Sequence, residues 1–147
     1  MMAVALSLAG LFVTAFGAAT ILPFQSEIVF AALQLRADIS VFWLVVVASI
    51  GNTLGSCVNY AMGLWVERFR GRRWFPVNDD QMARAKAWYL KWGVWSLLLS
   101  WAPLGDAITL MAGVMRTPLW LFMVMVGFAK TVRYIAFAAL TAGVLSL

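Results

Sequence analysis

Four charged residues stand within otherwise apolar sequence, and their side chains are the ones best suited to chemistry. Glu27 and Asp106 each follow a proline by a few residues, and Lys130 and Arg133 lie on the last apolar stretch. Charge at membrane depth is expensive and usually faces a partner, a cavity or a substrate path. Two carboxylates and two cations predict either an ion-pair network or a site for a charged ligand.

Two interpretations of these charges are open at the level of sequence. The simpler one is a structural ion pair, such as Asp106 with Arg133, that fixes a short segment against the last helix. The alternative is a phosphate headgroup site, in which Lys130 and Arg133 share one helix face because they are three residues apart. Glu27 or Asp106 would hold the cations until the headgroup arrives, and protonation of that acid would release them. Two acids and two bases in so short a chain favour the site.

The residues on which most enzymes rely are scarce. The chain has no histidine, the commonest general base and metal ligand, and Cys57 is its single cysteine. A disulfide within the chain and a cysteine-based metal site are therefore excluded. Because no nucleophile with a base and an orienting group is present either, we expect no enzyme activity, no metal and no cofactor.

The elements that position the charges are expected to lie in a membrane. Hydrophobic residues make up 64% of the 147 residues, charged residues make up 12%, and the mean hydropathy is +0.90. A soluble domain needs more polar surface than this composition offers. We therefore predict an all-α membrane protein with one domain over residues 1–147.

The net charge of +5 has a topological explanation. Most basic residues are concentrated in one connection, which contains Arg68, Arg70, Arg72, Arg73, Arg84, Lys86 and Lys91. Such a connection is typical of a cytoplasmic loop under the positive-inside rule. We therefore expect membrane lipids as partners and no nucleic acid.

Two of the four apolar tracts, residues 3–35 and 94–115, are interrupted near the acids. The breaks contain Pro23 in the first tract and Pro103 with Gly105 in the second. The helical part that follows Pro23 would cover only about 12 Å, less than half of a bilayer core of about 30 Å. We predict two re-entrant helical hairpins, with full crossing of both tracts as the alternative.

The other two tracts, residues 39–66 and the segment from Pro118 to the C-terminus, are long enough to span a bilayer. On the first of them, small and polar residues recur at spacings of three and four and form one stripe: Ser49, Asn52, Ser56, Asn59 and Gly63. The stripe either packs closely against another helix or lines a polar cavity. We include its two asparagines and Ser56 among the candidate pathway residues.

Gly51 and Gly55 form a small-xxx-small pair on the same tract. Small residues at this spacing let two helix backbones approach closely. Because a bundle with so few spans favours association, we expect this pair to be one candidate contact of a homo-oligomer.

A short amphipathic helix is predicted over residues 79–92, within the basic connection. Asn78 is a suitable N-cap, and Gln81 three residues later completes a capping box. The helical spacing of one face is kept by Met82, Ala85, Tyr89 and Trp92. Because tryptophans flank this segment, we expect the helix to lie in the membrane interface and to act as an anchor.

The chain divides into two similar halves around this connection. Residues 1–66 and 93–147 each hold a broken tract and then a spanning helix, and residues 67–92 form the basic loop and the amphipathic helix. Laid over one another without gaps, the halves match Pro23 with Pro103, Arg36 with Arg116, Phe42 with Phe122 and Gly63 with Gly143. Paired proline-interrupted segments are typical of inverted-repeat transporters. Re-entrant hairpins would then enter from opposite faces, whereas full crossing would place both chain ends in the cytoplasm.

Several short motifs carry a family likeness. They are Gly51-Asn52-Thr53-Leu54-Gly55, Asn59-Tyr60 and Gly63 on the second tract, Pro23 with Ser26-Glu27 on the first, and Trp101-Ala102-Pro103 with Ala112-Gly113 on the third. Over nearly the whole chain these motifs resemble the DedA family, also called the VTT or SNARE-associated superfamily, and above all its short YqaA-like branch.

The resemblance implies two oppositely entering re-entrant hairpins, a bacterial inner-membrane location and a role in moving lipids across the bilayer, with proton coupling proposed for some members. Carried over by position, Glu27 matches the family's hairpin glutamate. The chain departs from the family pattern at Ser56, where typical members have an acid, at Leu64, where they have an arginine, and at Asp106, where the second hairpin usually carries an arginine. The last helix would then supply the displaced positive charge.

We therefore expect a translocase or scramblase for a lipid phosphate, either a phospholipid or undecaprenyl phosphate, that contributes to envelope homeostasis. Two alternatives stay open: a proton-coupled transporter of small ions or solutes, and a noncatalytic membrane scaffold. The first alternative would move charge without lipid. The expected pathway residues are Glu27, Asp106, Lys130, Arg133, Asn52, Asn59 and Ser56.

Overall fold

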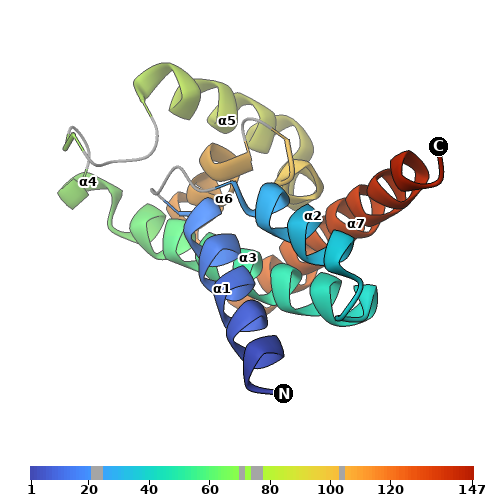
Figure 1. The fold of residues 1–147 in the computed structure, drawn as a ribbon. Helices are drawn as coiled ribbons and strands as arrows, with labels where there is room; N and C mark the ends of the chain where they lie inside the picture. The colour runs from blue at the N-terminus through green and yellow to red at the C-terminus, as the bar shows by residue number, and fades with distance from the viewer. Residues whose placement is uncertain (21–24, 70–71, 74–77, 103–104) are drawn as a thin grey trace.

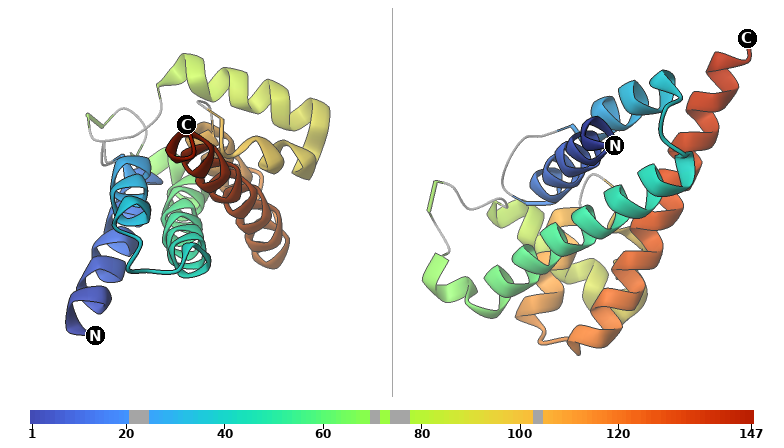
Figure 2. Two further views of the ribbon diagram at one scale, coloured as in Figure 1. Left: turned by 45° about the vertical axis from the view of Figure 1, so that its right-hand side comes forward. Right: turned by 60° about the horizontal axis from the view of Figure 1, so that its bottom comes forward.

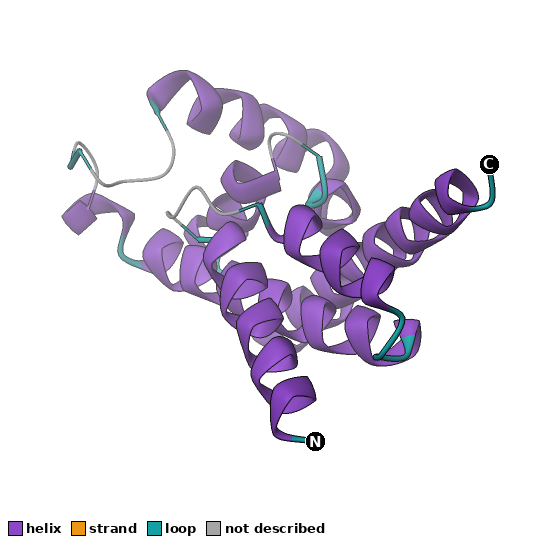
Figure 3. Cartoon of the chain, in the orientation of Figure 1, coloured by secondary structure: helices purple, strands orange, loops and turns teal. Residues whose placement is uncertain are grey.

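The described part of the chain consists of helices and their connections. The computed structural model describes residues 1–20, 25–69, 72–73, 78–102 and 105–147, and Figure 3 shows no strand within these ranges. The elements, drawn in Figure 1, are α1 (Met2–Ala18), α2 (Ser26–Arg36), α3 (Val41–Leu64), α4 (Val66–Phe69), α5 (Asp79–Trp92), the 3₁₀ helix η1 (Gly93–Leu99), α6 (Gly105–Val114) and α7 (Leu119–Leu145). The all-α prediction is confirmed for these residues, whereas the predicted breaks at Pro23 and Pro103 lie outside them.

The two longest helices in the described ranges are α3 and α7. They contain 24 and 27 residues, which correspond to about 36 and 40 Å, enough to cross a bilayer core of about 30 Å. Both are also apolar enough to do so. They pack against each other and cross, as Figure 2 shows. The two spanning tracts predicted from the sequence are therefore confirmed as long apolar helices.

Short helices fill the interrupted tracts. Helices α2 and α6 contain 11 and 10 residues, or about 16 and 15 Å, which is half of the bilayer core. Helix α2 begins at Ser26, three residues after Pro23, and α6 begins at Gly105, two residues after Pro103. The second interrupted tract opens with the 3₁₀ helix η1, and its Ser96 hydroxyl donates to the Trp88 carbonyl of α5 at 3.1 Å. Two short helices therefore start inside the bundle.

Helix α5 agrees with the amphipathic helix predicted over residues 79–92. The Asn78 side chain accepts from the Gln81 backbone N–H at 2.8 Å, and the Gln81 side chain accepts from the Asn78 N–H at 3.2 Å, so the predicted capping box is present. Ala85 and Tyr89 are buried, and the helix packs against α6 and η1. This face of α5 is therefore part of the core.

Helix α1 packs closely along α3. A Cβ atom added at Gly51 would lie 2.7 Å from the Phe12 carbonyl oxygen, and one added at Gly55 would lie 2.8 Å from the Ala19 Cβ. The predicted close helix approach is thus present, but its partner is α1 of the same chain. Because α1 covers both glycines, the structure offers them no free surface for a second copy of the chain, and the homo-oligomer itself stays a prediction.

Two apolar clusters lie at different levels of the bundle, and polar residues separate them. Along α3 the order is Leu44, Asn52 and Tyr60, and along α7 it is Phe122, Lys130 and Ala138. Tyr60 and Phe122 belong to one cluster, while Leu44 and Ala138 belong to the other. The two long helices therefore run in opposite directions, and their polar residues meet halfway along them.

Candidate functional site

The four charges predicted to matter meet at one polar cavity. Its volume is about 300 Å³, and it is lined by Ala18, Glu27, Asn52, Ser100, Trp101, Ala102, Asp106, Lys130 and Arg133. Both acids and both cations therefore stand on its wall, although the chain separates Glu27 from Arg133 by 106 positions. We call this space the polar cavity.

The charges are positioned by the first turns of α2 and α6 and by the middle of α7. Glu27 is the second residue of α2 and Asp106 is the second residue of α6, where the positive end of the helix dipole stabilises a carboxylate. Lys130 and Arg133 project from the middle of α7. Because α7 is long enough to span the membrane, the polar cavity lies deep within the spanning part.

Glu27 and Arg133 form an ion pair across the polar cavity. Arg133 Nη2 donates to Glu27 Oε1, and the Ser26 hydroxyl donates to Glu27 Oε2 at 3.4 Å. The two side chains keep 26% and 33% exposure, respectively. The sequence suggested Asp106 as an example of a partner for Arg133, but the guanidinium pairs with the acid of α2. Because the pair is only partly buried, a ligand can reach both of its members.

Lys130 is the most deeply buried charge of the polar cavity. Only 2% of the residue is exposed, and its Nζ donates to the Ser100 carbonyl oxygen at 2.9 Å. The ammonium is attracted by the charges of Asp106 and Glu27 and repelled by that of Arg133. A buried ammonium needs such partners because its transfer out of water is costly.

Asp106 is held by its own helix start and by an asparagine of α3. Asn59 Nδ2 lies 3.5 Å from Asp106 Oδ1 and donates to the Ala19 carbonyl oxygen at 2.7 Å. The Thr109 hydroxyl donates to the Asp106 carbonyl oxygen at 2.9 Å. Asn59 therefore links the end of α1, the carboxylate of α6 and the middle of the bundle.

Tyr134 connects the helices behind the ion pair. Its hydroxyl lies 2.7 Å from the Ser26 hydroxyl and accepts from Asn52 Nδ2 at 3.3 Å. The tyrosine is fully buried, and its ring stacks on Phe30 at a centroid distance of 5.6 Å. Asn52 also donates to the Ala15 carbonyl oxygen at 3.0 Å. This network fixes the position at which α2 presents Glu27.

The predicted polar stripe of α3 has two roles. Asn52 lines the polar cavity and Asn59 contacts its carboxylate, as the cavity interpretation predicted. Ser56 is buried but donates to the Asn52 carbonyl oxygen at 3.1 Å, so it does not line the polar cavity. Ser49 lines a separate groove, and Gly63 packs against α6. Ser56, which the sequence suggested as a pathway residue, therefore does not reach the polar cavity.

Some of the buried polar atoms that lack a hydrogen-bond partner belong to residues around the same space. Within the described ranges, the side-chain oxygens Asn52 Oδ1, Asn59 Oδ1 and Ser100 Oγ are buried and make no hydrogen bond. Buried polar groups are almost always hydrogen-bonded, because leaving one unpaired costs about 1–3 kcal/mol. These three oxygens therefore keep unused hydrogen-bonding capacity close to the charges.

Sequence reasoning assigned no pathway role to Ser100, Trp101 or Tyr134. The first two precede the break at Pro103, and Trp101 belongs to one of the family motifs. Ser100 contributes its carbonyl oxygen to Lys130, a role that residue type does not indicate. In the described part of the chain, no group of three or more His, Cys, Asp or Glu side chains is arranged to hold a metal ion.

Comparison with known proteins agrees with the motifs. The chain matches the VTT domain over residues 2–143. It is 37% identical over 143 residues to the inner membrane protein YqaA of Escherichia coli strain K12, covering 95% of this chain and 94% of that protein, and the same values hold for YqaA of Shigella flexneri. An uncharacterized protein of Haemophilus influenzae is 31% identical over 138 residues, covering 88% of this chain and 84% of its own length. No solved structure matches significantly.

These matches cover almost the whole chain, including every motif on which the family resemblance rested. The two long apolar helices and the inner-membrane relatives together confirm the predicted location as an integral protein of the inner membrane. The chain belongs to the DedA family of VTT-domain membrane proteins.

Proposed function

We propose that this protein moves a phosphate-bearing lipid across the inner membrane, with the polar cavity receiving the headgroup. The observation that carries the proposal is the convergence of two acids and two cations on a space of about 300 Å³ at the middle of a spanning helix. Charged residues at the middle of a membrane-spanning helix usually pair with another charge or line the path of a substrate or ion. Membership of the DedA family is consistent with a transporter-type role.

The arrangement suggests how a headgroup is exchanged for an internal partner. A phosphate carries negative charge and accepts several hydrogen bonds, so it competes with the Glu27 carboxylate for the Arg133 guanidinium. Lys130 adds a second cation on the same face of α7. In this proposal Glu27 holds Arg133 until the headgroup arrives, and the phosphate then replaces the carboxylate as the partner of the guanidinium.

We further propose that residues 1–66 and 93–147 form an inverted repeat with two re-entrant hairpins, within one domain. Three corresponding features support this. The short helices α2 and α6 carry an acid at their second position. Each is followed by a residue with left-handed backbone, Ala37 with φ 55° and Arg116 with φ 54°. Each also contacts the long helix of the other half, α2 on α7 and α6 on α3.

Lipid movement in proteoliposomes tests the proposal. Vesicles containing the protein and a fluorescent phospholipid or polyprenyl phosphate should exchange the lipid between leaflets faster than protein-free vesicles. Lys130→Met should slow exchange by about tenfold or more, which corresponds to ~1.4 kcal/mol of barrier. Lys91→Met, which removes an exposed lysine of α5, should not slow it.

Two results would replace the proposal. Charge movement without lipid movement in the wild type would favour a proton-coupled transporter of small ions or solutes. Absence of both movements from a correctly inserted protein would favour a scaffold. Verified folding and equal reconstitution of each variant are required for these comparisons.

A further inference from the structure

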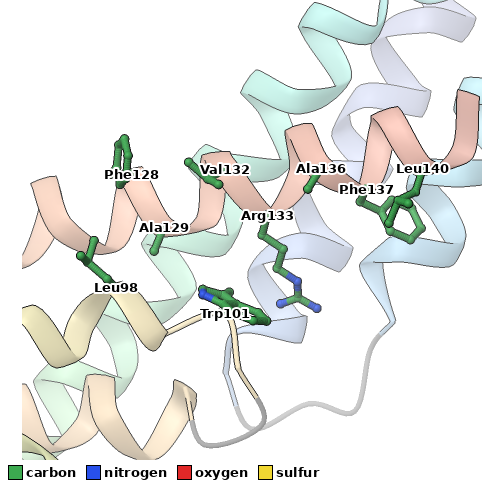
Figure 4. Close-up of a pocket in the computed structure, with 9 residues that line it drawn as sticks. All are labelled: Leu98, Trp101, Phe128, Ala129, Val132, Arg133, Ala136, Phe137 and Leu140. Carbon is green, nitrogen blue, oxygen red and sulfur yellow. The ribbon is translucent and has the colours of Figure 1, made fainter. Parts of the chain in front are cut away.

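An apolar groove runs along α7 beside the polar cavity. Its volume is about 450 Å³, and the residues that form most of its wall are Leu98, Trp101, Phe128, Val132, Arg133 and Phe137, drawn in Figure 4. Val132 and Phe128 are 48% and 62% exposed. The groove is therefore open along the outer face of α7, where the surrounding membrane is hydrocarbon. We call it the apolar groove.

The apolar groove and the polar cavity share two residues. Trp101 and Arg133 line both spaces, and Figure 4 shows the Arg133 side chain extending from α7 toward Trp101. The guanidinium pairs with Glu27 in the polar cavity, whereas an arginine stem is apolar and packs along hydrocarbon. One residue thus marks the place where the two spaces meet.

The combined shape matches an amphipathic ligand. A charged compartment of about 300 Å³ joins an apolar one of about 450 Å³, and each is within the range of small-molecule sites, about 300–1,000 Å³. A second large groove lies between α3 and α7, and its wall includes Phe42, Val46 and Ile135 but no charged residue. Hydrocarbon alone would fit either groove. Of these two grooves, only the apolar groove shares residues with the polar cavity, so it is the one that places a headgroup beside the charges.

We propose that one hydrocarbon chain of a phosphate-headed lipid lies in the apolar groove while its headgroup occupies the polar cavity. This inference rests on the proposed function, since it assigns the path of the chain of the transported lipid. The occupant is a single chain, because the wall is formed by one face of α7 with the η1 side chain Leu98 and the adjacent Trp101. Arg133 then contacts the phosphate with its guanidinium and the first part of the chain with its stem.

Photolabelling of the reconstituted protein tests the inference. The probe is hexadecyl phosphate with a diazirine in the middle of its chain, and the adducts are mapped by mass spectrometry. Labelling should concentrate on Trp101 and on residues 128–140. Unlabelled hexadecyl phosphate should compete about tenfold better than uncharged hexadecanol or inorganic phosphate alone. Hexadecanol lacks the phosphate that contacts the charges, and inorganic phosphate lacks the chain that fills the groove.

A substitution that fills the groove provides the matched comparison. Ala136 lines the apolar groove and Ala139 lines the other groove, and both are exposed on α7. Ala136→Trp should reduce labelling by about tenfold, whereas Ala139→Trp should leave it unchanged. If Ala136→Trp does not fold by circular dichroism and size exclusion, Val132→Trp fills the same groove at another exposed position.

Two outcomes would overturn the inference: adducts spread equally over both grooves, or equal competition by hexadecanol. Its failure is distinguishable from failure of the proposed function. If lipid is exchanged but the adducts are dispersed, the proposed transport function stands and the apolar groove is rejected as the site of the hydrocarbon chain. If the adducts concentrate in the apolar groove but no lipid is exchanged, the groove stands as a site for an amphiphile and the proposed transport function is rejected.

Discussion

Glu27 and Arg133 form an ion pair that joins the first turn of α2 to the middle of α7. Because 106 positions separate the two residues along the chain, the pair is a product of the tertiary fold. Both side chains are partly exposed to the polar cavity, unlike those of a fully buried structural pair. An anion that enters the polar cavity therefore meets a guanidinium that is already positioned and can change partner.

The energetic coupling between Glu27 and Arg133 should be measurable. Exposed ion pairs contribute about 0–1 kcal/mol, whereas breaking a buried pair costs about 3–5 kcal/mol. This half-buried pair should fall between these limits, so a double-mutant cycle of Glu27→Gln and Arg133→Gln should give a coupling of about 1–2 kcal/mol in the free energy of unfolding. Additive effects of the two substitutions would show that the pair contributes no stability.

Removal of Lys130 alone should lower stability more than joint removal of Lys130 and Asp106. Lys130→Met leaves the Ser100 carbonyl oxygen without its donor and removes one of the two cations, Lys130 and Arg133, whose charges act on Asp106. The expected loss of unfolding free energy is about 1–3 kcal/mol. Adding Asp106→Asn removes the carboxylate charge that Lys130 no longer offsets and should restore most of the unfolding free energy in detergent micelles. Lipid exchange should stay lost in both variants. Exchange at the wild-type rate in the double variant would exclude these charges from transport.

Loss of the Tyr134 hydroxyl should loosen the attachment of α2. Tyr134→Phe keeps the stacking on Phe30 but removes the hydrogen-bond partner shared by Ser26 and Asn52. The expected loss is about 1 kcal/mol of unfolding free energy. Ser26→Ala should have a similar effect, and the two substitutions together should cost less than their sum, because both break the same bond. Full additivity would mean that the hydroxyls do not stabilise each other.

The contact between α3 and α6 should tolerate little added volume. A Cβ atom at Gly113 would collide with the Tyr60 carbonyl oxygen and lie 3.0 Å from the Gly63 Cα. Gly113→Ala should therefore destabilise the protein by about 1–3 kcal/mol. Gly143→Ala is the matched control, because nothing lies within 4 Å of its added Cβ. The control should gain about 0.5–1 kcal/mol from helix propensity.

Local features of this fold were predictable from the sequence. The bounds of α5 and its capping box follow from Asn78, Gln81 and the spacing of the apolar face. The two spans follow from the length of unbroken apolar sequence, and the short helices follow from the breaks near the acids. Each of these signals depends on residues a few positions apart, where propensity and periodicity decide the structure.

Tertiary pairings were less predictable. The sequence identified the four charges, but it did not determine that Arg133 pairs with Glu27 or that Lys130 binds the Ser100 backbone carbonyl. A carbonyl oxygen is present at every residue, so residue type carries no signal for that acceptor. The sequence also did not determine which helix packs against Gly51 and Gly55, because a stripe of small residues allows any helix to approach closely. Packing of α1 on α3 determines the outcome.

Exchange of the charges between positions 27 and 133 tests the central claim most directly. The variant Glu27→Arg with Arg133→Glu retains an ion pair but places the cation on α2 and the acid on α7. If these charges form the headgroup site, the double variant should recover most of the stability lost in the single variants, while lipid exchange in proteoliposomes stays at the protein-free rate. Recovery of lipid exchange together with stability would contradict the account and identify the pair as a structural lock.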